Sequence, residues 1–473
     1  MEGTLEESRS LEERQSLVDS QQEPMANVFR SFEIGEEKSG SDRTLRGRKW
    51  GSTDYFFLII GLCSILGTVW VGRTYDEFEA IWSLLQVEKS QYDFKTGWQK
   101  GQVNISIVAK ALESGAVCLD GSPPAYFLDR GSDEGANNWL LFHEGGSWCP
   151  NADACRQRSY TGLGSSRNMK LHVRFGGILS SSPIHNPDFY NWNRVFLKYC
   201  DGGSFNGDVN DPMQVANSSI NGTAPVVNIF FRGQRIWKAL MEELMEKGMQ
   251  NAEKALLSGR SAGGLATILH CDQYRDFMPN TTLVKCLSDA GFFLDIPDIS
   301  GVETIEAFYS NVVQLHNMVG NLPKYCTSER EATRCIFPEY IIPGLKTPFF
   351  VLNPAYDTWQ MDHVLVPSAA DPTGIWDDCR GDLSFCSDAQ FRFVQGFRDS
   401  LLEKLQPVLH KEENGAFIDS CYYHSQAQTD STWNGLKVDN KTIAQVVGDW
   451  YFERNLTKVI DCPYPCNPTC PGF

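Results

Sequence analysis

The chain has 473 residues, and 42 lysines and arginines stand against 59 aspartates and glutamates, which gives a formal net charge of −17 at pH 7. With 42% hydrophobic and 21% charged residues, the composition is typical of globular proteins and excludes a fibrous or wholly disordered chain. The acidic balance argues against a general nucleic-acid binder, because such proteins need a basic face to displace counterions from phosphates.

The first 49 residues predict a disordered, acidic cytosolic tail that ends in a basic cluster. Residues 1–40 hold ten acidic and four basic residues and show no apolar periodicity. Such segments cannot bury enough apolar surface to offset the entropy of ordering. The basic cluster consists of Arg43, Arg46, Arg48 and Lys49.

A hydrophobic segment follows the basic cluster. Tyr55–Gly72 contains eighteen residues without a charge, which is close to the minimum length for crossing a bilayer. Its basic side is N-terminal, so the positive-inside rule keeps the tail in the cytosol. We therefore expect a transmembrane signal-anchor over residues 50–73, a stalk over 74–100 and an exported domain over 101–473. A cleaved signal peptide is the alternative.

This topology predicts a single-pass type II membrane protein, held in the membrane by one N-terminal helix. The folded domain would lie in the lumen of the secretory pathway or outside the cell. Export also predicts N-glycosylation, and every sequon considered lies after the hydrophobic segment. The candidate asparagines are Asn104, Asn217, Asn221, Asn280, Asn440 and Asn455.

The fifteen cysteines favour an oxidising compartment, because no paired CxxC set has the spacing of a zinc site. Cys63 lies in the hydrophobic segment, which leaves fourteen cysteines in the exported part. That even number permits up to seven disulfides. The last three cysteines, Cys462, Cys466 and Cys470, alternate with prolines and predict a disulfide-stapled tail.

The exported part alternates short apolar runs with helical patterns, which predicts an α/β fold with a mostly parallel central sheet. We expect strands over residues 139–142 and 195–197, a helix over 234–247 and a further strand over 255–257. The first strand leads directly into a glycine-containing loop, His143–Cys149.

The most informative segment is Gly259–Gly263, which has the pattern G-x-S-x-G around Ser261. It follows an expected strand and precedes a helix-compatible run. In this context the glycines permit a sharp strand-to-helix turn that exposes a nucleophilic serine. A glycine-rich connecting turn is the alternative. Ala262, next in the chain, would supply one backbone N–H to an oxyanion hole, and the Gly145-Gly146-Ser147 loop would supply another.

A serine nucleophile needs a base and a residue that orients the base, in the chain order Ser, Asp, His for α/β-hydrolases. Asp357 leaves the end of an expected strand over residues 348–352, and Asp362 is a possible substitute. His424 follows the apolar segment 417–423. The other histidines after the serine are His270, His316, His363 and His410.

Seven blocks in one order give the chain a family resemblance. They are GAVCLDGS (115–122), EGGSWC (144–149), NWNR (191–194), FRGQR (231–235), SAGG (261–264), AYDTWQ (355–360) and DCPYPC (461–466). With these blocks the chain resembles the plant pectin acetylesterase family, to which the animal carboxylesterase Notum is distantly similar. The likeness spans about Val103 to Cys470 and leaves out the tail and the anchor.

The resemblance implies an α/β-hydrolase-like fold and a serine esterase that removes acetyl groups from pectin homogalacturonan in the plant cell wall. It assigns the nucleophile to Ser261, the acid to Asp357 and the base to His424. The oxyanion donors fall on Gly146, Ser147 and Ala262. Residues 101–473 would then be the esterase domain, with acetylated pectin as its partner and no metal or cofactor.

The chain departs from the family at three positions. Family members commonly have glycine where this chain has Ser147, and a serine there would be strained if the position requires a positive φ. Many members have cysteine at the positions of Arg260 and Ser425. Arg232 and Arg235 could line a groove for an anionic sugar, with a structural role as the alternative.

Two other functions stay open at this point. One is deacylation of another target, either acetylated xylan or an acylated protein. The other is a membrane-tethered glycan-binding protein without catalysis, for which Ser147 and Arg260 are the only indications.

Overall fold

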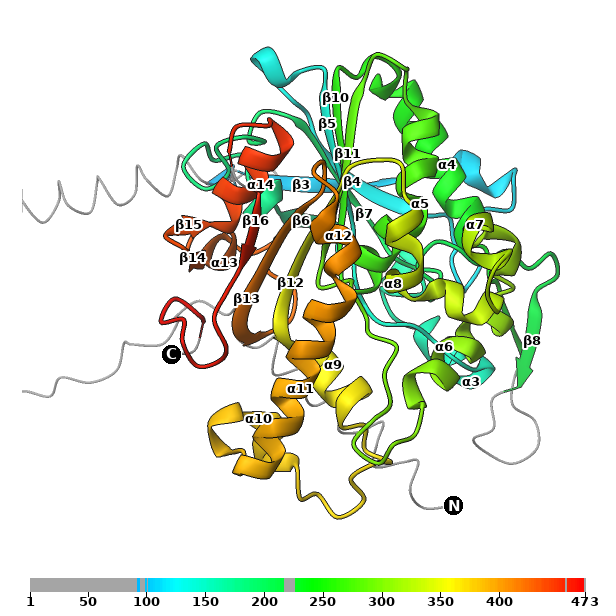
Figure 1. Ribbon diagram of the computed structural model, residues 1–473. Coiled ribbons are helices and arrows are strands. Elements are labelled where there is room, and N and C mark those ends of the chain that lie inside the picture. The colour runs from blue at the N-terminus through cyan, green and yellow to red at the C-terminus, as the bar shows by residue number, and fades with distance from the viewer. Residues whose placement is uncertain (1–91, 94–97, 100, 217–225, 456, 472–473) are drawn as a thin grey trace, which may run out of the picture. The chain divides into compact units, whose positions relative to one another are not determined.

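The centre of the fold is a ten-stranded sheet in which seven neighbouring strands run parallel (Figure 1). The computed structural model describes residues 92–93, 98–99, 101–216, 226–455 and 457–471. The chain divides into two units, Met1–Gln86 and Val87–Phe473. All described residues belong to the second unit.

The strand order across the sheet is β16-β13-β12-β11-β10-β5-β7-β4-β3-β6. The parallel strands are β7 (Asn193–Leu197), β5 (Asn138–His143), β10 (Lys254–Arg260), β11 (Leu283–Asp289), β12 (Phe349–Asp357), β13 (Gly415–Tyr423) and β16 (Lys458–Ile460). Antiparallel pairing joins β4 (Ala125–Asp129), β3 (Gln102–Ile107) and β6 (His172–Arg174) at the other edge.

Three two-stranded sheets complete the β structure of the described residues. They are β1 (Tyr92–Asp93) with β2 (Trp98–Gln99), β8 (Met213–Ala216) with β9 (Val226–Ile229), and β14 (Lys437–Val438) with β15 (Lys441–Thr442).

Helices cover both faces of the central sheet, so its strands are nearly continuous apolar runs, as parallel sheets require. Helices α4 (Gly233–Glu246) and α5 (Ala262–Phe277) lie on one face, and α13 (Asp430–Trp433) and α14 (Ile443–Tyr451) lie on the other (Figure 1). The alternation along β10 divides the core accordingly: Leu257 packs in the cluster that contains α4 and α5, and Leu256 packs in the cluster that contains α14.

Helix α4 shows how the sequence pattern specifies this packing. Ile236, Leu240 and Leu244 are buried at helical spacing, whereas Lys238 and Glu242 on the opposite side are exposed. The remaining helices are α3 (Ala152–Arg158), α6 (Thr304–Leu315), α7 (Lys324–Thr327), α8 (Pro338–Ile341), α9 (Thr358–Gln360), α10 (Asp377–Gly381), α11 (Asp388–Lys404) and α12 (Gln406–His410).

The fold confirms the expected α/β class with a mostly parallel sheet. Each strand expected from the sequence falls on an observed one, namely β5, β7, β10 and β12, and the expected helix over 234–247 falls on α4. The apolar segment 417–423 lies in strand β13. Boundaries differ by a few residues, most of all at β12, which continues to Asp357 itself.

All fourteen cysteines from Cys118 to Cys470 pair in seven disulfides, which is the largest number that the sequence permitted. The pairs are Cys118–Cys200, Cys149–Cys155, Cys271–Cys286, Cys326–Cys335, Cys379–Cys386, Cys421–Cys470 and Cys462–Cys466. The last two pairs confirm the disulfide-stapled tail. This number of disulfides fits passage through the secretory pathway.

The expected signal-anchor over residues 50–73 lies outside the described residues, together with the tail and most of the stalk. Among the helices that the structure describes, none is both long and apolar enough to span a bilayer. Four sequon asparagines are described and all four are exposed, namely Asn104, Asn280, Asn440 and Asn455. Asn217 and Asn221 fall outside the described residues.

Candidate active site

Ser261 occupies a strained turn between a strand and a helix. Strand β10 ends at Arg260 and helix α5 begins at Ala262, and Ser261 between them has φ 55° and ψ −127°. A positive φ is unfavourable for a residue with a Cβ, and such strain persists only where the surroundings impose it. The Ser261 N–H donates to the Asp289 carbonyl oxygen at 2.8 Å, which fixes the turn to the neighbouring strand β11.

Two glycines let the loop after β5 approach this turn. A Cβ added to Gly145 would lie 2.9 Å from the Ser261 Cβ, and one added to Gly263 would collide with the carbonyl oxygens of His143 and Glu144. Only glycine fits where two backbones come this close. The predicted serine turn and the predicted glycine loop are therefore in direct contact.

Asp357 and His424 form a hydrogen-bonded pair. The two residues leave adjacent parallel strands, β12 and β13, whose register places Asp357 opposite Tyr423. The His424 Nδ1 lies 2.8 Å from the Asp357 Oδ2, so the imidazole N–H donates to the carboxylate. The Asp357 side chain is fully buried, and that of His424 is 21% exposed. The other Asp357 oxygen accepts the Gln360 N–H at 2.9 Å, which holds the carboxylate in place.

The other residues considered for the acid and the base do not belong to this hydrogen-bonded pair. Asp362 falls in the helical turn Met361–Leu365, beyond the end of β12. His270 is buried and bonded to the Phe205 carbonyl oxygen at 3.1 Å. His363 donates to the Trp359 carbonyl oxygen and stacks on the Trp359 ring. His410 is exposed at the end of α12. The structure therefore pairs Asp357 with His424, the two residues that the family resemblance assigned as acid and base.

Asp289 joins the serine turn to the loop that follows His424, although it belongs to none of the sequence motifs described above. Its carboxylate is buried and accepts the Gln426 N–H at 2.8 and 2.9 Å and the Ala427 N–H at 2.8 Å. Burial raises the Asp289 pKa to about 6, although these N–H donors oppose the shift. The signal that the sequence offered for Asp289 was its place at the end of a mostly apolar run that forms strand β11. Functional groups gather at the carboxyl ends of parallel strands.

The loop expected to form part of an oxyanion hole runs from the end of β5 to Cys149. Gly146 and Ser147 both have positive φ, 146° and 54°, so Ser147 occupies a conformation that favours glycine. The Ser147 carbonyl accepts the Tyr199 hydroxyl at 2.9 Å. In the described part of the chain, neither the Gly146 nor the Ser147 backbone N–H donates to another protein group.

Ser204 connects this loop to the start of helix α5. Its Oγ accepts the Trp148 indole N–H at 2.7 Å and donates to the Ala262 carbonyl oxygen at 2.8 Å. The first N–H groups of a helix have no partner within the helix. The N–H of Ala262 is therefore available to donate a hydrogen bond from the start of helix α5. The N–H groups of Gly146 and Ser147 are available to donate from the loop.

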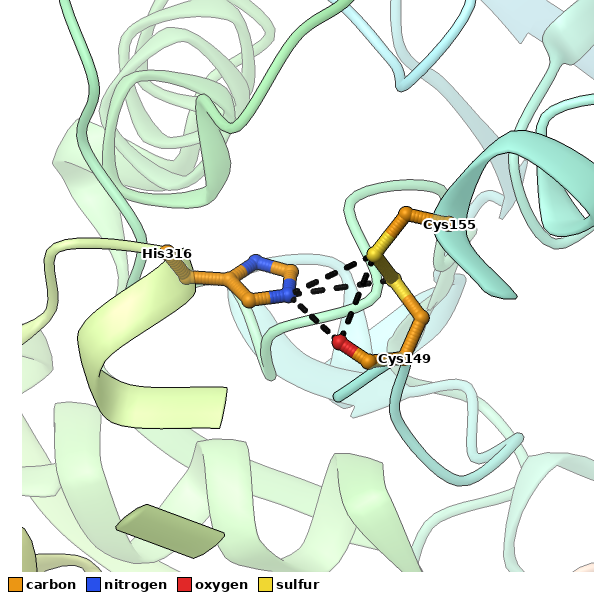
Figure 2. Close-up of side chains that lie close together, drawn as sticks. All are labelled: Cys149, Cys155 and His316. Atoms are coloured by element: carbon orange, nitrogen blue, oxygen red, sulfur yellow. Dashed lines mark hydrogen bonds between the residues drawn. A yellow bond between two sulfur atoms is a disulfide. The ribbon is translucent and has the colours of Figure 1, made fainter. Parts of the chain in front are cut away.

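A buried histidine holds the far end of the loop (Figure 2). His316 follows helix α6, and its Nε2 donates to the Cys149 carbonyl oxygen at 3.0 Å while facing the Cys149–Cys155 disulfide. Burial lowers the His316 pKa to about 4, so the ring is neutral at ordinary pH. The two sulfur atoms and this ring are close enough to suggest a metal site, but a metal ligand must be a thiolate and both sulfurs are in the disulfide.

The two arginines considered for a sugar groove are engaged by the protein. Arg232 is buried and donates to the Gly115 carbonyl oxygen at 3.2 Å. Arg235 pairs with Asp208 at 2.6 Å. These contacts favour the structural role that the sequence left as an alternative.

The fold and the side chains at its carboxyl edge are those of a serine hydrolase: a strained serine turn, a buried carboxylate bonded to a histidine, and a glycine loop against the serine. The chain belongs to the pectinacetylesterase family, whose model matches residues 97–471. This membership confirms the resemblance noted from the sequence.

Individual relatives agree with this assignment. The chain is 47% identical to pectin acetylesterase 7 of Arabidopsis thaliana over 79% of this chain and 94% of that protein. It is 28% identical to the palmitoleoyl-protein carboxylesterase NOTUM of Mus musculus over 76% of this chain and 71% of that protein. The crystal structure of the Wnt deacylase Notum from Drosophila is 25% identical, with a TM-score of 0.64, and the match covers 78% of this chain and all of that one.

The buried carboxyl of Asp419 yields a prediction about pH. Asp419 lies on β13 and accepts the Gln426 side-chain N–H at 3.1 Å, so it supports the same loop as Asp289. Burial raises the Asp419 pKa from 3.8 to about 7. The folded protein therefore binds a proton at this site over a range in which the unfolded chain has lost it. This contribution to stability declines as the pH rises from about 4 to about 7, by up to about 1.4 kcal/mol per pH unit.

We expect the stability of Asp419→Asn relative to the unsubstituted protein to increase between pH 4 and pH 7 and to level off above. The measurement is the free energy of unfolding of both proteins by denaturant at several pH values. Burial lowers the pKa values of His270 and His316 to about 4, so their contribution to stability rises with pH instead of declining. Both histidines are present in both proteins, and their contribution therefore cancels in the difference. A difference that stays constant or declines with pH contradicts the assignment.

Proposed function

We propose that this protein is a serine esterase that hydrolyses acetyl esters of pectin homogalacturonan in the plant cell wall and releases acetate. One observation carries the proposal: the buried Asp357–His424 pair and the strained Ser261 turn lie at the carboxyl ends of parallel strands, in a member of the pectinacetylesterase family. The identity of 47% to a pectin acetylesterase, against 28% to a palmitoleoyl-protein carboxylesterase, favours acetylated pectin over an acylated protein.

The proposed reaction is a two-step acyl transfer. His424 takes the hydroxyl proton of Ser261 as the oxygen attacks the acetyl carbonyl. The sugar oxygen leaves with the proton now held by His424, and the acetyl group stays on Ser261. A water molecule then gives a proton to His424 and attacks the acetyl-serine. Acetate is released, and the proton returns to the serine oxygen.

Asp357 supports the base in this scheme. Its carboxylate accepts the Nδ1–H of His424, which leaves the Nε2 of the neutral ring free to receive the serine proton. The same carboxylate stabilises the imidazolium that forms in each step. Because Asp357 is completely buried, this interaction is poorly screened by water.

The backbone N–H groups of Gly146, Ser147 and Ala262 are the proposed oxyanion donors. Each donor in such a site contributes about 3 kcal/mol to stabilising the transition state. The Ser204 bridge between Trp148 and Ala262 would keep the two groups of donors aligned. The positive φ of Ser147 is a local strain that would orient its N–H toward the same point.

We expect Ser261→Ala to abolish acetate release from acetylated pectin, because no other group supplies the nucleophile. Asp357→Asn should lower kcat by about four orders of magnitude, since the histidine would be held in the wrong tautomer. The assay is acetate release by the purified domain, with Asp362→Asn as the matched control. Acetate release by Ser261→Ala at the unsubstituted rate would refute the assignment.

We also infer from the sequence that residues 50–73 anchor the protein in a membrane, with residues 101–473 as the esterase domain on the lumenal or outer side. Support comes from the uncharged segment Tyr55–Gly72 and the basic cluster before it. The disulfides and the exposed sequon asparagines fit the same side.

The anchor predicts that the full chain, expressed in plant cells with an N-terminal tag, stays in the membrane pellet after alkaline carbonate extraction and keeps its tag. A chain without residues 50–73 serves as the control. Loss of the tag with a soluble domain would instead indicate a cleaved signal peptide.

A further inference from the structure

Arg260, the residue before Ser261, is a cation without a direct partner. It ends strand β10, and its side chain is half-buried. The Nε atom is shielded from solvent and has no hydrogen-bond partner. Within the described residues, the guanidinium makes no hydrogen bond or ion pair. Arg232 and Arg235, by contrast, are bonded to backbone and carboxylate oxygens.

The side chain of Arg260 lies against the glycine loop that touches Ser261. A Cβ added to Gly145, in the loop that touches Ser261, would lie 3.3 Å from the Arg260 Cγ. In the sheet register Arg260 stands opposite Asp289, and its charge acts on Asp289 and on Tyr423, the residue before His424. Arg260 therefore lies beside the glycine loop and beside Asp289, the residue that holds the loop after His424.

Asp289 does not neutralise this cation by direct contact. Both of its carboxylate oxygens are occupied by the N–H groups of Gln426 and Ala427, and it forms no ion pair with Arg260 within 4.0 Å. A partly buried guanidinium with no direct counterion has lost some hydration without full compensation. An anion that arrived with a substrate would supply that compensation, and a planar carboxylate matches the guanidinium geometry best.

We propose that Arg260 forms a subsite for the carboxylate of a uronate residue, so that the enzyme prefers acetyl esters on free uronate over esters on neutral sugars. The proposal rests on the proposed function, since it places the carboxylate next to the ester that Ser261 attacks. The adjacency of Arg260 and Ser261 requires that this carboxylate belong to the acetylated sugar or its immediate neighbour. Methyl esterification of the carboxyl would remove the interaction.

The test compares two polymers of equal acetyl content: acetylated homogalacturonan with free carboxylates, and the same polymer after methyl esterification of its carboxyls. For Arg260→Gln, kcat/KM on the free-acid polymer should decrease at least tenfold more than on the methyl ester, mainly through KM. Arg260→Lys should recover part of the loss. Arg392→Gln, which removes an exposed arginine from α11, is the matched control and should leave the preference unchanged.

An equal decrease on both polymers would overturn the proposal and assign Arg260 a structural role, and no decrease on either would also overturn it. A second measurement separates this outcome from failure of the proposed function. If the unsubstituted protein hydrolyses 4-nitrophenyl acetate but neither polymer, pectin deacetylation is refuted. Inhibition of 4-nitrophenyl acetate hydrolysis by oligogalacturonate then tests the subsite: it should weaken at least tenfold in Arg260→Gln, and equal inhibition of both proteins would refute the subsite.

Discussion

The geometry of the site depends on the hydrogen bonds made by one buried residue, Asp289. Its side chain accepts the backbone N–H groups of Gln426 and Ala427, and its carbonyl oxygen accepts the N–H of Ser261. One residue at the end of strand β11 therefore fixes both the serine turn and the loop after His424. Charge-assisted hydrogen bonds of this kind are strong inside a protein, because the low local dielectric weakens them little.

The opposite side of the site depends on a separate set of contacts. Ser204 joins Trp148 to Ala262, and His316 holds the Cys149 carbonyl at the end of the same loop. The loop can therefore keep Ser147 at a positive φ, since strain of this kind persists when several contacts determine the backbone together. Rigid support on both sides matches what an esterase requires, because stabilising an oxyanion depends on donors that are already in place.

The sequence predicts the parts of this arrangement that follow from local pattern. Apolar runs specified β10, β12 and β13, and the residues that leave those strands, Ser261, Asp357 and His424, are the ones that the sheet brings to one edge. The pairings made by Asp289, Ser204 and His316 link segments far apart in the chain, and no local pattern encodes them. The even number of cysteines after the hydrophobic segment allowed seven disulfides, but only the fold reveals which cysteines meet.

The net charge of −17 is also distributed in a way that bears on the substrate. Residues 1–40 carry 4 − 10 = −6 of it, which leaves −11 for the rest of the chain. In the anchored topology proposed above, residues 1–40 would stay in the cytosol, and the total would then overstate the repulsion of an anionic polymer. The most direct test of the central claim is reaction of the folded protein with a fluorophosphonate, followed by mapping of the adduct by mass spectrometry. The account predicts one adduct, on Ser261, that is lost in His424→Ala. An unlabelled Ser261, or an adduct on another serine, would contradict it.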